Sequence, residues 1–590
     1  RTLYPDYVFE AAKRYQEMSN PTVEDAWYRA DDLIYFLGTN LPKNLAIRDY
    51  SPQQNYNFSI SGAGERTAYY VSLGATDKKG FFKYNSEEYN RYNALFKLDF
   101  DVTDWLTLEG KLMFTAIKND NPHEYNANTH YNSIGTQWFS IASEFPDLEY
   151  YLVPGDRSEF EPYIGMLSRN NPAAYLQAGG RDLNRENEIL FSQAVRISPF
   201  DGLMINGDFS YRNYWSNLKR VHSKIDMSNT NERGYSLTGP LVTNDITGSD
   251  WIDFTSRLNS YIVTNIYAEY TVQNLGYHQL KGLVGVNQEY EKYEDVNTRS
   301  TELITPSIPS LSATTGITTN SEGGGEFMLR GLFYRLNYSY KDKYLFEANG
   351  RYDGTSKFPK DRRFGFFPSF AAAWRISEES FMDITNNWLD GLKLRGSYGI
   401  LGNQNVGSFY PYISVMGAGT SNLLLYNNGD FIQTISPGNL VSRNLTWETV
   451  TNKNLGIDLS VFASRLNLSF DYFIRDTKDM LMNKSYPGIL GTSAPKENAA
   501  DLRNVGWELS AGWIHYTDND WSYRLNVSLS DYETTITKYD NPTGAINDYY
   551  VGKKIGEIWG YQTVGLFQTK EELENAADQS RIGSNWRLGD

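Results

Sequence analysis

Histidine is the side chain best suited to acid–base catalysis and to transition-metal binding near neutral pH, and this chain contains five histidines. They are His123, His130, His222, His278 and His515, and none shows the H-E-x-x-H spacing of a zinc site. The chain has no cysteine, no G-x-S-x-G elbow and no G-x-x-x-x-G-K-[ST] phosphate loop. We therefore predict no catalytic residue, no metal site and no cofactor site.

Other short patterns have simple structural explanations. The stretch "SNLK" at Ser216 matches the S-x-x-K pattern of some acylating enzymes, but four residues of this kind occur by chance in a chain of 590. The glycines Gly62 and Gly64 predict a turn, and the run Gly323–Gly325 predicts the end of a loop. None of these stretches indicates an active site.

The stretch "GRYDGTSKF" combines Arg351, Asp353 and Gly354. Its charged pair could contact a ligand, or it could form an inward-facing salt bridge next to a turn. We expect the structural role.

Aromatic side chains among Asn and Asp could stack on sugar rings or hold peptide side chains. They occur in two long polar segments, as Trp138, Phe139, Tyr150, Tyr151, Phe160, Tyr410, Tyr412 and Tyr426. The simpler interpretation is that they pack loop against loop or against a partner protein. The sequence therefore assigns no substrate-binding residue.

The elements that position these residues are β-strands with two different faces. In "NALFKLDFDV", Ala94, Phe96 and the following even-numbered residues are apolar, while Lys97, Asp99 and Asp101 alternate with them. Placing Lys97 at the middle of a bilayer would cost about 2–4 kcal/mol, so the charged face must meet water. The apolar face would then meet lipid.

Pairs of such strands joined by short turns recur along the chain, and we predict sixteen strands between residues 55 and 532. The remaining connections are long, at 118–186, 216–258, 291–325, 403–449 and 478–503. Because short turns alternate with long loops, every long loop lies at one end of the sheet, as in outer-membrane barrels.

Tyrosines and tryptophans near strand ends predict two interfacial girdles. The predicted loop-side girdle comprises Tyr89, Tyr92, Tyr214, Trp215, Tyr261, Tyr290 and Tyr293, and the turn-side girdle comprises Trp105, Tyr340 and Tyr344.

Composition argues against membrane helices and leaves a soluble protein or a membrane β-barrel. Mean hydropathy is −0.53, and no run approaches the roughly 18 consecutive apolar residues of a membrane helix. The net charge of −16 disfavours a nucleic-acid partner, because phosphate binding needs clustered Lys and Arg. Residues 1–54 contain two stretches with helical spacing, "DYVFEAAKRYQEMS" and "TVEDAWYRADDLIYFL". We predict a connecting region at 1–54 and a partial transmembrane antiparallel β-barrel at 55–590.

Several stretches together resemble one family. "YRLNYSYKDKYLFEANGRYDGTSKFPKDRRFGFFPSFAAAWRISEESF", which begins at Tyr334, is similar to the signature of the SusC/RagA-type TonB-dependent outer-membrane transporters of Bacteroidetes. "NFSISGAGERTAYYVSLGATDKKG", "RYNALFKLDFDVTDWLTL", "LKLRGSYGILGNQN", "LTWETVTNKNLGIDLSVF", "FDYFIRDTKDML" and "NVGWELSAGW" resemble the same family in the same order.

The resemblance implies a 22-stranded barrel with an N-terminal plug, a SusD-like surface lipoprotein as a lid, and energy from TonB, ExbB and ExbD. It also implies a dimer of transporter–lid pairs. Sixteen strands fit part of such a barrel, so the plug and TonB box are expected before Arg1 and the last strands after Asp590.

The resulting hypothesis is active import of an oligosaccharide, or else a peptide, across the outer membrane without covalent chemistry. A passive porin or surface adhesin is the main alternative. An outer-membrane barrel enzyme is a further alternative, which the few histidines disfavour.

Overall fold

A computed structural model gives the structure of the chain. It describes residues 6–19, 27–30, 33–36, 48–82, 86–123, 180–223, 226–228, 235–236, 241–243, 250–305, 308–425, 431–483, 495–517, 521–542, 544–560, 562–563, 565–578, 583 and 586–589. Within these ranges, no helix is both long and apolar enough to cross a membrane.

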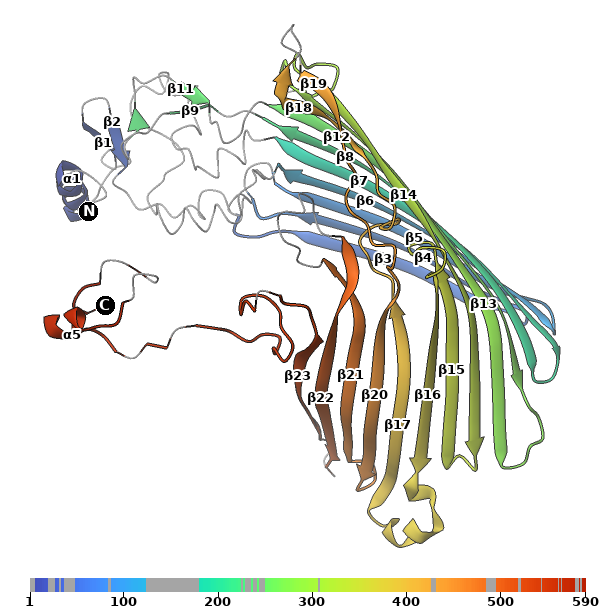
Figure 1. The fold of residues 1–590 in the computed structure, drawn as a ribbon. Coiled ribbons are helices and arrows are strands. Elements are labelled where there is room, and N and C mark those ends of the chain that lie inside the picture. Colours follow the sequence, from blue (N-terminus) through green and yellow to red (C-terminus); the bar gives the residue numbers. More distant parts are fainter. Residues whose placement is uncertain are drawn as a thin grey trace.

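The main element is one antiparallel sheet of sixteen strands, each paired with its neighbours along the chain, as Figure 1 shows. The sheet is an open part of a barrel, with β3 and β23 at its two edges. Its strands are β3 (Gln53–Ala63), β4 (Thr67–Lys79), β5 (Glu88–Thr103), β6 (Leu106–Pro122), β7 (Arg181–Phe200), β8 (Leu203–His222), β12 (Trp251–Thr271), β13 (His278–Thr301), β14 (Thr318–Tyr340), β15 (Tyr344–Thr355), β16 (Phe364–Arg375), β17 (Leu389–Asn403), β20 (Glu448–Val461), β21 (Leu466–Asn483), β22 (Lys496–Tyr516) and β23 (Ser522–Lys538). The predicted number of strands and the all-β antiparallel fold are confirmed.

The strands are longer than the sequence indicated, and β13 alone has 24 residues. A bilayer needs about 9–11 residues per strand, so the longest strands continue well beyond it. The predicted loop bounds 118–186, 216–258, 291–325 and 478–503 are therefore wrong, because the strands extend into them and leave the connections 123–180, 223–250, 302–317 and 484–495. Polar residues in these extensions resembled loop sequence, although their backbone groups continue the ladder.

The two faces of the sheet differ as the alternation predicts. On one face, here called the outer face, Leu525, Val527 and Leu529 of β23 are all more than 40% exposed. On the opposite inner face, polar side chains bond to each other, as in the ion pair of Lys97 with Asp99. Exposed apolar side chains at every second position suit a lipid-facing surface.

Several short helices and strands lie outside the sixteen-stranded sheet. They are α1 (Asp6–Glu17), the strand pair β1 (Trp27–Ala30) and β2 (Leu33–Phe36), β9 (Asp226–Ser228), β10 (Tyr235–Ser236), β11 (Leu241–Thr243), β18 (Gly417–Leu425), β19 (Phe431–Ser436), the 3-10 helices η4 (Ile376–Glu378) and η5 (Ser380–Thr385), and α5 (Lys570–Glu574). The helix expected in "DYVFEAAKRYQEMS" is confirmed as α1.

The second expected helix is wrong, because "TVEDAWYRADDLIYFL" contains the β1–β2 pair. Aromatic and β-branched residues favour strands, and pairing of β2 with β10 supplies partners that the local sequence does not show. The predicted division at residue 54 stays a prediction.

Candidate functional site

A ladder of hydrogen bonds crosses the inner face near its middle. Asn265 of β12 donates to Asp208 of β8 at 2.7 Å, and Asn287 of β13 donates to Asn265 at 2.8 Å. Arg351 of β15 pairs with Asp353 at 2.9 Å and reaches Asn287 at 3.5 Å.

Gly331 of β14 lies in the middle of this ladder, where a Cβ atom would overlap the Asp353 carboxylate and the Arg351 guanidinium. The missing side chain lets the charged pair extend over β14. The predicted inward salt bridge is confirmed, and the turn beside it is the reversal at 356–363 that follows β15, whereas Gly354 itself lies within β15.

A second inner-face network lies closer to the short turns. Arg395 of β17 binds Asp458 of β20 through Nε at 3.1 Å and Asp471 of β21 through its other nitrogens. Ser469 donates to Asp458 at 2.9 Å, so the charged groups are mutually satisfied. A concave part of the inner face, about 630 Å³, adjoins this network and is lined by small polar residues that include Ser460, Ser510 and Ser528.

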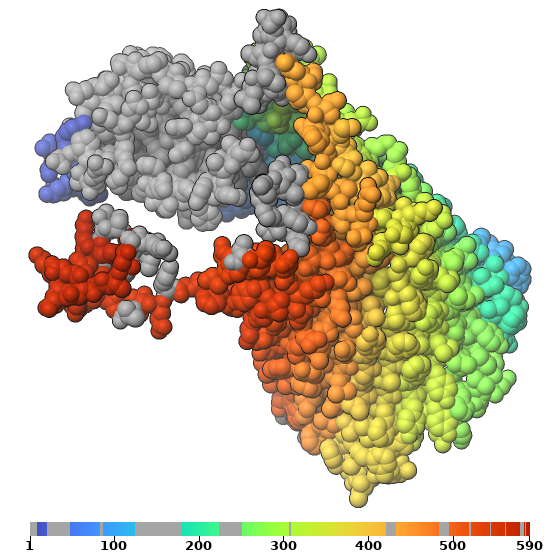
Figure 2. Space-filling view, viewed as in Figure 1, coloured from blue at the N-terminus to red at the C-terminus, as the bar shows by residue number. Residues whose placement is uncertain are grey.

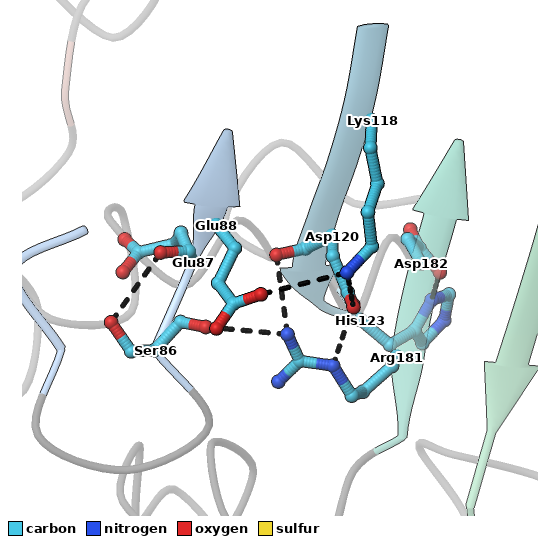
Figure 3. A network of polar contacts seen from close by, with 8 residues as sticks. All are labelled: Ser86, Glu87, Glu88, Lys118, Asp120, His123, Arg181 and Asp182. Carbon is cyan, nitrogen blue, oxygen red and sulfur yellow. Dashed lines mark hydrogen bonds and ion pairs between the residues drawn. The ribbon is translucent and has the colours of Figure 1, made fainter. Parts of the chain in front are cut away.

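At the loop side, a network of ion pairs and hydrogen bonds joins the strand ends between which the β6–β7 connection runs (Figure 3). We call this network the clamp. Arg181, the first residue of β7, donates to the Asp120 carboxylate at 2.7 Å and to the Ser86 carbonyl at 3.2 Å. Lys118 lies 3.5 Å from both Glu88 and Asp120. These contacts join the ends of β5, β6 and β7, and they fix where the long connection leaves and returns.

Beside this clamp, two of the five histidines meet a tryptophan. The rings of His222 and Trp251 are stacked with centroids 5.2 Å apart, and the His123 ring is perpendicular to both at 5.2 Å. His123 Nδ1 lies 2.6 Å from the Asp182 carboxylate. Within the described residues, no group of three or more His, Cys, Asp or Glu is arranged to hold a metal ion.

A buried carboxylate organises the same region. Asp253 of β12 accepts from Arg220 of β8 and Arg299 of β13, both at 2.9 Å, and also from Asn297. The Arg299 guanidinium also lies 4.0 Å from the centre of the Trp251 ring. Three strand ends are thereby tied together through one side chain that is 2% exposed.

An aromatic shelf lies on the inner face at the loop side of β13 and β14. Phe409, from the connection between β17 and β20, stacks on Phe327 at 5.7 Å and contacts Tyr293 at 5.3 Å. The ammonium of Lys357 lies 4.4 Å from the centre of the Phe327 ring, and burial lowers the pKa of Lys357. Gly325 permits this packing, because a Cβ atom there would overlap Phe409.

The run Gly323–Gly325 is therefore part of β14, and its assignment to a loop end is wrong. The glycines serve close packing on a strand, which a Gly-rich sequence by itself does not distinguish from a loop.

A small hydrophobic core holds the connections beside the shelf. It comprises Phe358, Phe367, Val406, Leu445 and Trp447. Trp447 donates to the Arg363 carbonyl at 2.8 Å, and Tyr412 donates to the Ser356 carbonyl at 3.3 Å. Residues 356–363 thus pack on the described parts of the β17–β20 connection around Val406, Tyr412 and Trp447, so Tyr412 has the loop-packing role that the simpler interpretation predicted.

Other predicted residues have varied positions. Tyr410 contacts the Tyr412 ring, and burial raises the pKa of Tyr410.

The S-x-x-K pair, Ser216 and Lys219, lies on β8, where two residues three positions apart point to opposite faces of the sheet. Lys219 therefore does not face Ser216, and it bonds to the Pro309 carbonyl. Gly64 forms the predicted turn by bonding to Thr67, whereas Gly62 lies in β3. Outside the described residues lie Trp138, Phe139, Tyr150, Tyr151, Phe160, Tyr426 and His130.

The predicted girdles are partly wrong. On the loop side, Tyr261 donates to Glu289 at 2.7 Å on the inner face, and Tyr293 belongs to the aromatic shelf. On the turn side, Tyr340 and Tyr344 do lie on the outer face, with their ring centroids 6.3 Å apart. Nearness to a predicted strand end does not give the face of a ring, because successive side chains of a strand point to opposite faces.

Sequence reasoning missed Asp253, Trp251 and Phe409. The available signal was the alternation in β12, since Trp251 and Asp253 share the face of Asn265. The inner face as a whole can hold polar molecules through carboxylates, guanidinium groups, amides and exposed ring edges.

Comparison with known proteins shows the family of the chain. Residues 143–566 match the family described as TonB dependent receptor-like, beta-barrel. TonB-dependent receptor P39 of Formosa agariphila is 26% identical over 92% of this chain and 48% of its own length. TonB-dependent receptor SusC of Bacteroides thetaiotaomicron is 26% identical over 88% of the chain and 51% of its own length. The chain thus spans about half the length of these curated relatives.

Solved structures share the fold. The RagAB peptide transporter matches with a TM-score of 0.70 at 18% identity, over 90% of this chain and 55% of that one. The outer-membrane transporter YddB from Escherichia coli matches with a TM-score of 0.52 at 10% identity, over 82% of this chain and 55% of that one.

Proposed function

Because the chain belongs to the TonB dependent receptor-like β-barrel family, we propose that it forms the barrel wall of an active nutrient importer of the outer membrane. The cargo is an oligosaccharide, or else a peptide. It enters from the loop side and leaves on the turn side, driven by TonB with ExbB and ExbD. No covalent step is involved, so the protein is not an enzyme.

The observation that carries this proposal is the contrast between the two faces of the sheet. The outer face exposes apolar side chains, whereas the inner face carries bonded ladders such as Asp208–Asn265–Asn287. A wet inner wall and a lipid-facing outer wall are what a transport barrel requires. The loop-side clusters add a rigid entrance, where a surface lid protein would dock.

We further propose a SusD-like lipoprotein as that lid, in a dimer of transporter–lid pairs. This rests on the likeness to SusC and on the two-component name of RagAB. Neither relative decides between sugar and peptide for this chain, because 26% and 18% identity leave the cargo-contacting residues free to differ.

The test is purification of the full-length protein from native outer membranes in mild detergent, followed by mass spectrometry of all retained molecules. A co-purifying lipoprotein with bound oligosaccharide or peptide would support import and name the cargo. Recovery of the barrel without lid or cargo, from cells whose nutrient uptake does not depend on TonB, would favour a passive porin or adhesin.

A further inference from the structure

One turn of the sheet differs from the others. The connection between β16 and β17 contains η4 and η5 and extends to Trp388, whereas β14 and β15 are joined by three residues, 341–343. This β16–β17 turn forms the yellow tip of the sheet in Figure 2. It displays Phe381, Ile384 and Trp388 with 62%, 85% and 48% exposure, and the adjacent β20–β21 turn displays Phe462 with 50%.

The turn is anchored to aromatic residues of the outer face. Glu379, between η4 and η5, accepts from the Tyr344 hydroxyl at 2.6 Å and from Trp374 Nε1 at 3.1 Å. The rings of Tyr344 and Trp374 are stacked with centroids 6.3 Å apart. Both residues share the face of Phe346 and Phe370, so the β16–β17 turn continues from the lipid-facing surface.

Apolar side chains of the outer face become buried next to the β16–β17 turn. Leu455 and Ile457 of β20 are 55% and 43% exposed, but Val461 on the same face is 4% exposed. Its partner Leu389, the residue after Trp388, is 5% exposed. The end of the apolar surface is therefore covered by the protein itself, and the turns present their own apolar side chains in its place.

We propose that the β16–β17 turn, with Phe462, lies in the boundary between headgroups and acyl chains of the inner leaflet of the outer membrane. Tryptophan and phenylalanine are favourable at this depth, where an apolar ring meets lipid and a polar edge meets water. The occupant is lipid because the turn is bonded through Glu379 to Tyr344 and Trp374, two rings of the lipid-facing outer face. The proposal depends on the outer-membrane location and not on import.

The test uses the full-length protein reconstituted into phosphatidylcholine bilayers that contain spin-labelled lipid. The 590 residues contain no cysteine, so Ile384→Cys can carry an environment-sensitive fluorescent label in this part of the protein. We expect blue-shifted emission that spin-labelled lipid quenches and iodide does not. The matched control is Asp104→Cys, in the β5–β6 turn at the same end of the sheet, whose side chain is 95% exposed.

The inference is overturned if the label at Ile384→Cys is quenched by iodide as strongly as the label at Asp104→Cys, and no more by lipid. A second variant tests whether Glu379 holds the turn in place beside the lipid. Adding Glu379→Gln should weaken the bonds to Tyr344 and Trp374 and reduce lipid quenching at position 384, with the Asp104→Cys signal unchanged. Unchanged lipid quenching at position 384 would contradict the anchoring step.

Discussion

The two ends of the sheet are built differently. At the loop side, Phe358 and Ile252 are at most 1% exposed, and Asp253 ties three strands together. At the turn side, Phe381 and Trp105 are more than half exposed. Packing holds the loop side without help from the membrane, whereas the turn side presents apolar groups that a bilayer would cover. The loop-side clusters are therefore packed within the described part of the protein itself, and four substitutions can test this contrast.

The largest effect is expected for Phe358→Ala, which removes a fully buried ring from the loop-side core. Loss of such a ring costs about 3–5 kcal/mol, so opening of 356–363, 404–412 and 440–447 should become easier. Hydrogen exchange of their amides in the folded barrel measures this free energy. Phe381→Ala at the turn side is the control and should change it by less than about 0.5 kcal/mol.

Asp253→Ala should have the next largest effect, because Arg220 and Arg299 lose a shared buried partner. We expect a loss of about 1–3 kcal/mol, limited by the water that still reaches both arginines. Chemical denaturation of the detergent-solubilised barrel measures it.

The control is Asp104→Ala, which breaks the exposed pair with Arg66 at the turn side. That pair should contribute less than about 1 kcal/mol. Equal losses in the two variants would contradict the distinction between the two ends.

Gly325→Val tests the aromatic shelf, since the added side chain would overlap Phe409. Overpacking of this kind costs about 1–3 kcal/mol, and the strain should loosen 404–447 more than it destabilises the strands. Protease sensitivity of that connection is the measurement. Gly282→Val on β13, where a Cβ atom meets nothing within 4 Å, is the control and should leave the sensitivity unchanged.

The smallest effect concerns pH at the turn side. The hydroxyl of Tyr344 and the indole of Trp374 lower the pKa of Glu379 from 4.5. A carboxylate with a lowered pKa stabilises the folded state above its unfolded pKa, and this contribution is lost as the pH falls through the folded value. Glu379→Gln should therefore flatten the stability profile below about pH 4.5, measured by thermal unfolding. An identical acid profile in both proteins would refute the contribution.

Much of the fold followed from the sequence. The alternation in residues 93–102 identified two faces, and short turns between alternating runs gave the correct number of strands. Charged extensions such as Glu291–Asp295 were mistaken for loops, because a strand beyond the bilayer no longer needs an apolar face. The predicted strand bounds were therefore wrong where one strand continues from the bilayer into water.

The site was less predictable. The pairing of Arg351 with Asp353 was accessible, because residues two apart on a strand share a face. The meeting of Phe409 with Phe327, or of His123 with Trp251, joins residues that are far apart in the chain. The alternation of apolar and polar residues along one strand therefore does not predict these contacts.

Features that repeat locally follow from the sequence: strand periodicity, the apolar and polar faces, and the side on which the long connections lie. The three-dimensional arrangement of the strands is needed to know which rings face inward, which glycines make room for a neighbour, and how the loop-side clusters assemble. The physical reason is that side-chain direction along a strand is set by its own backbone, whereas packing depends on chain segments whose approach is fixed by the whole sheet.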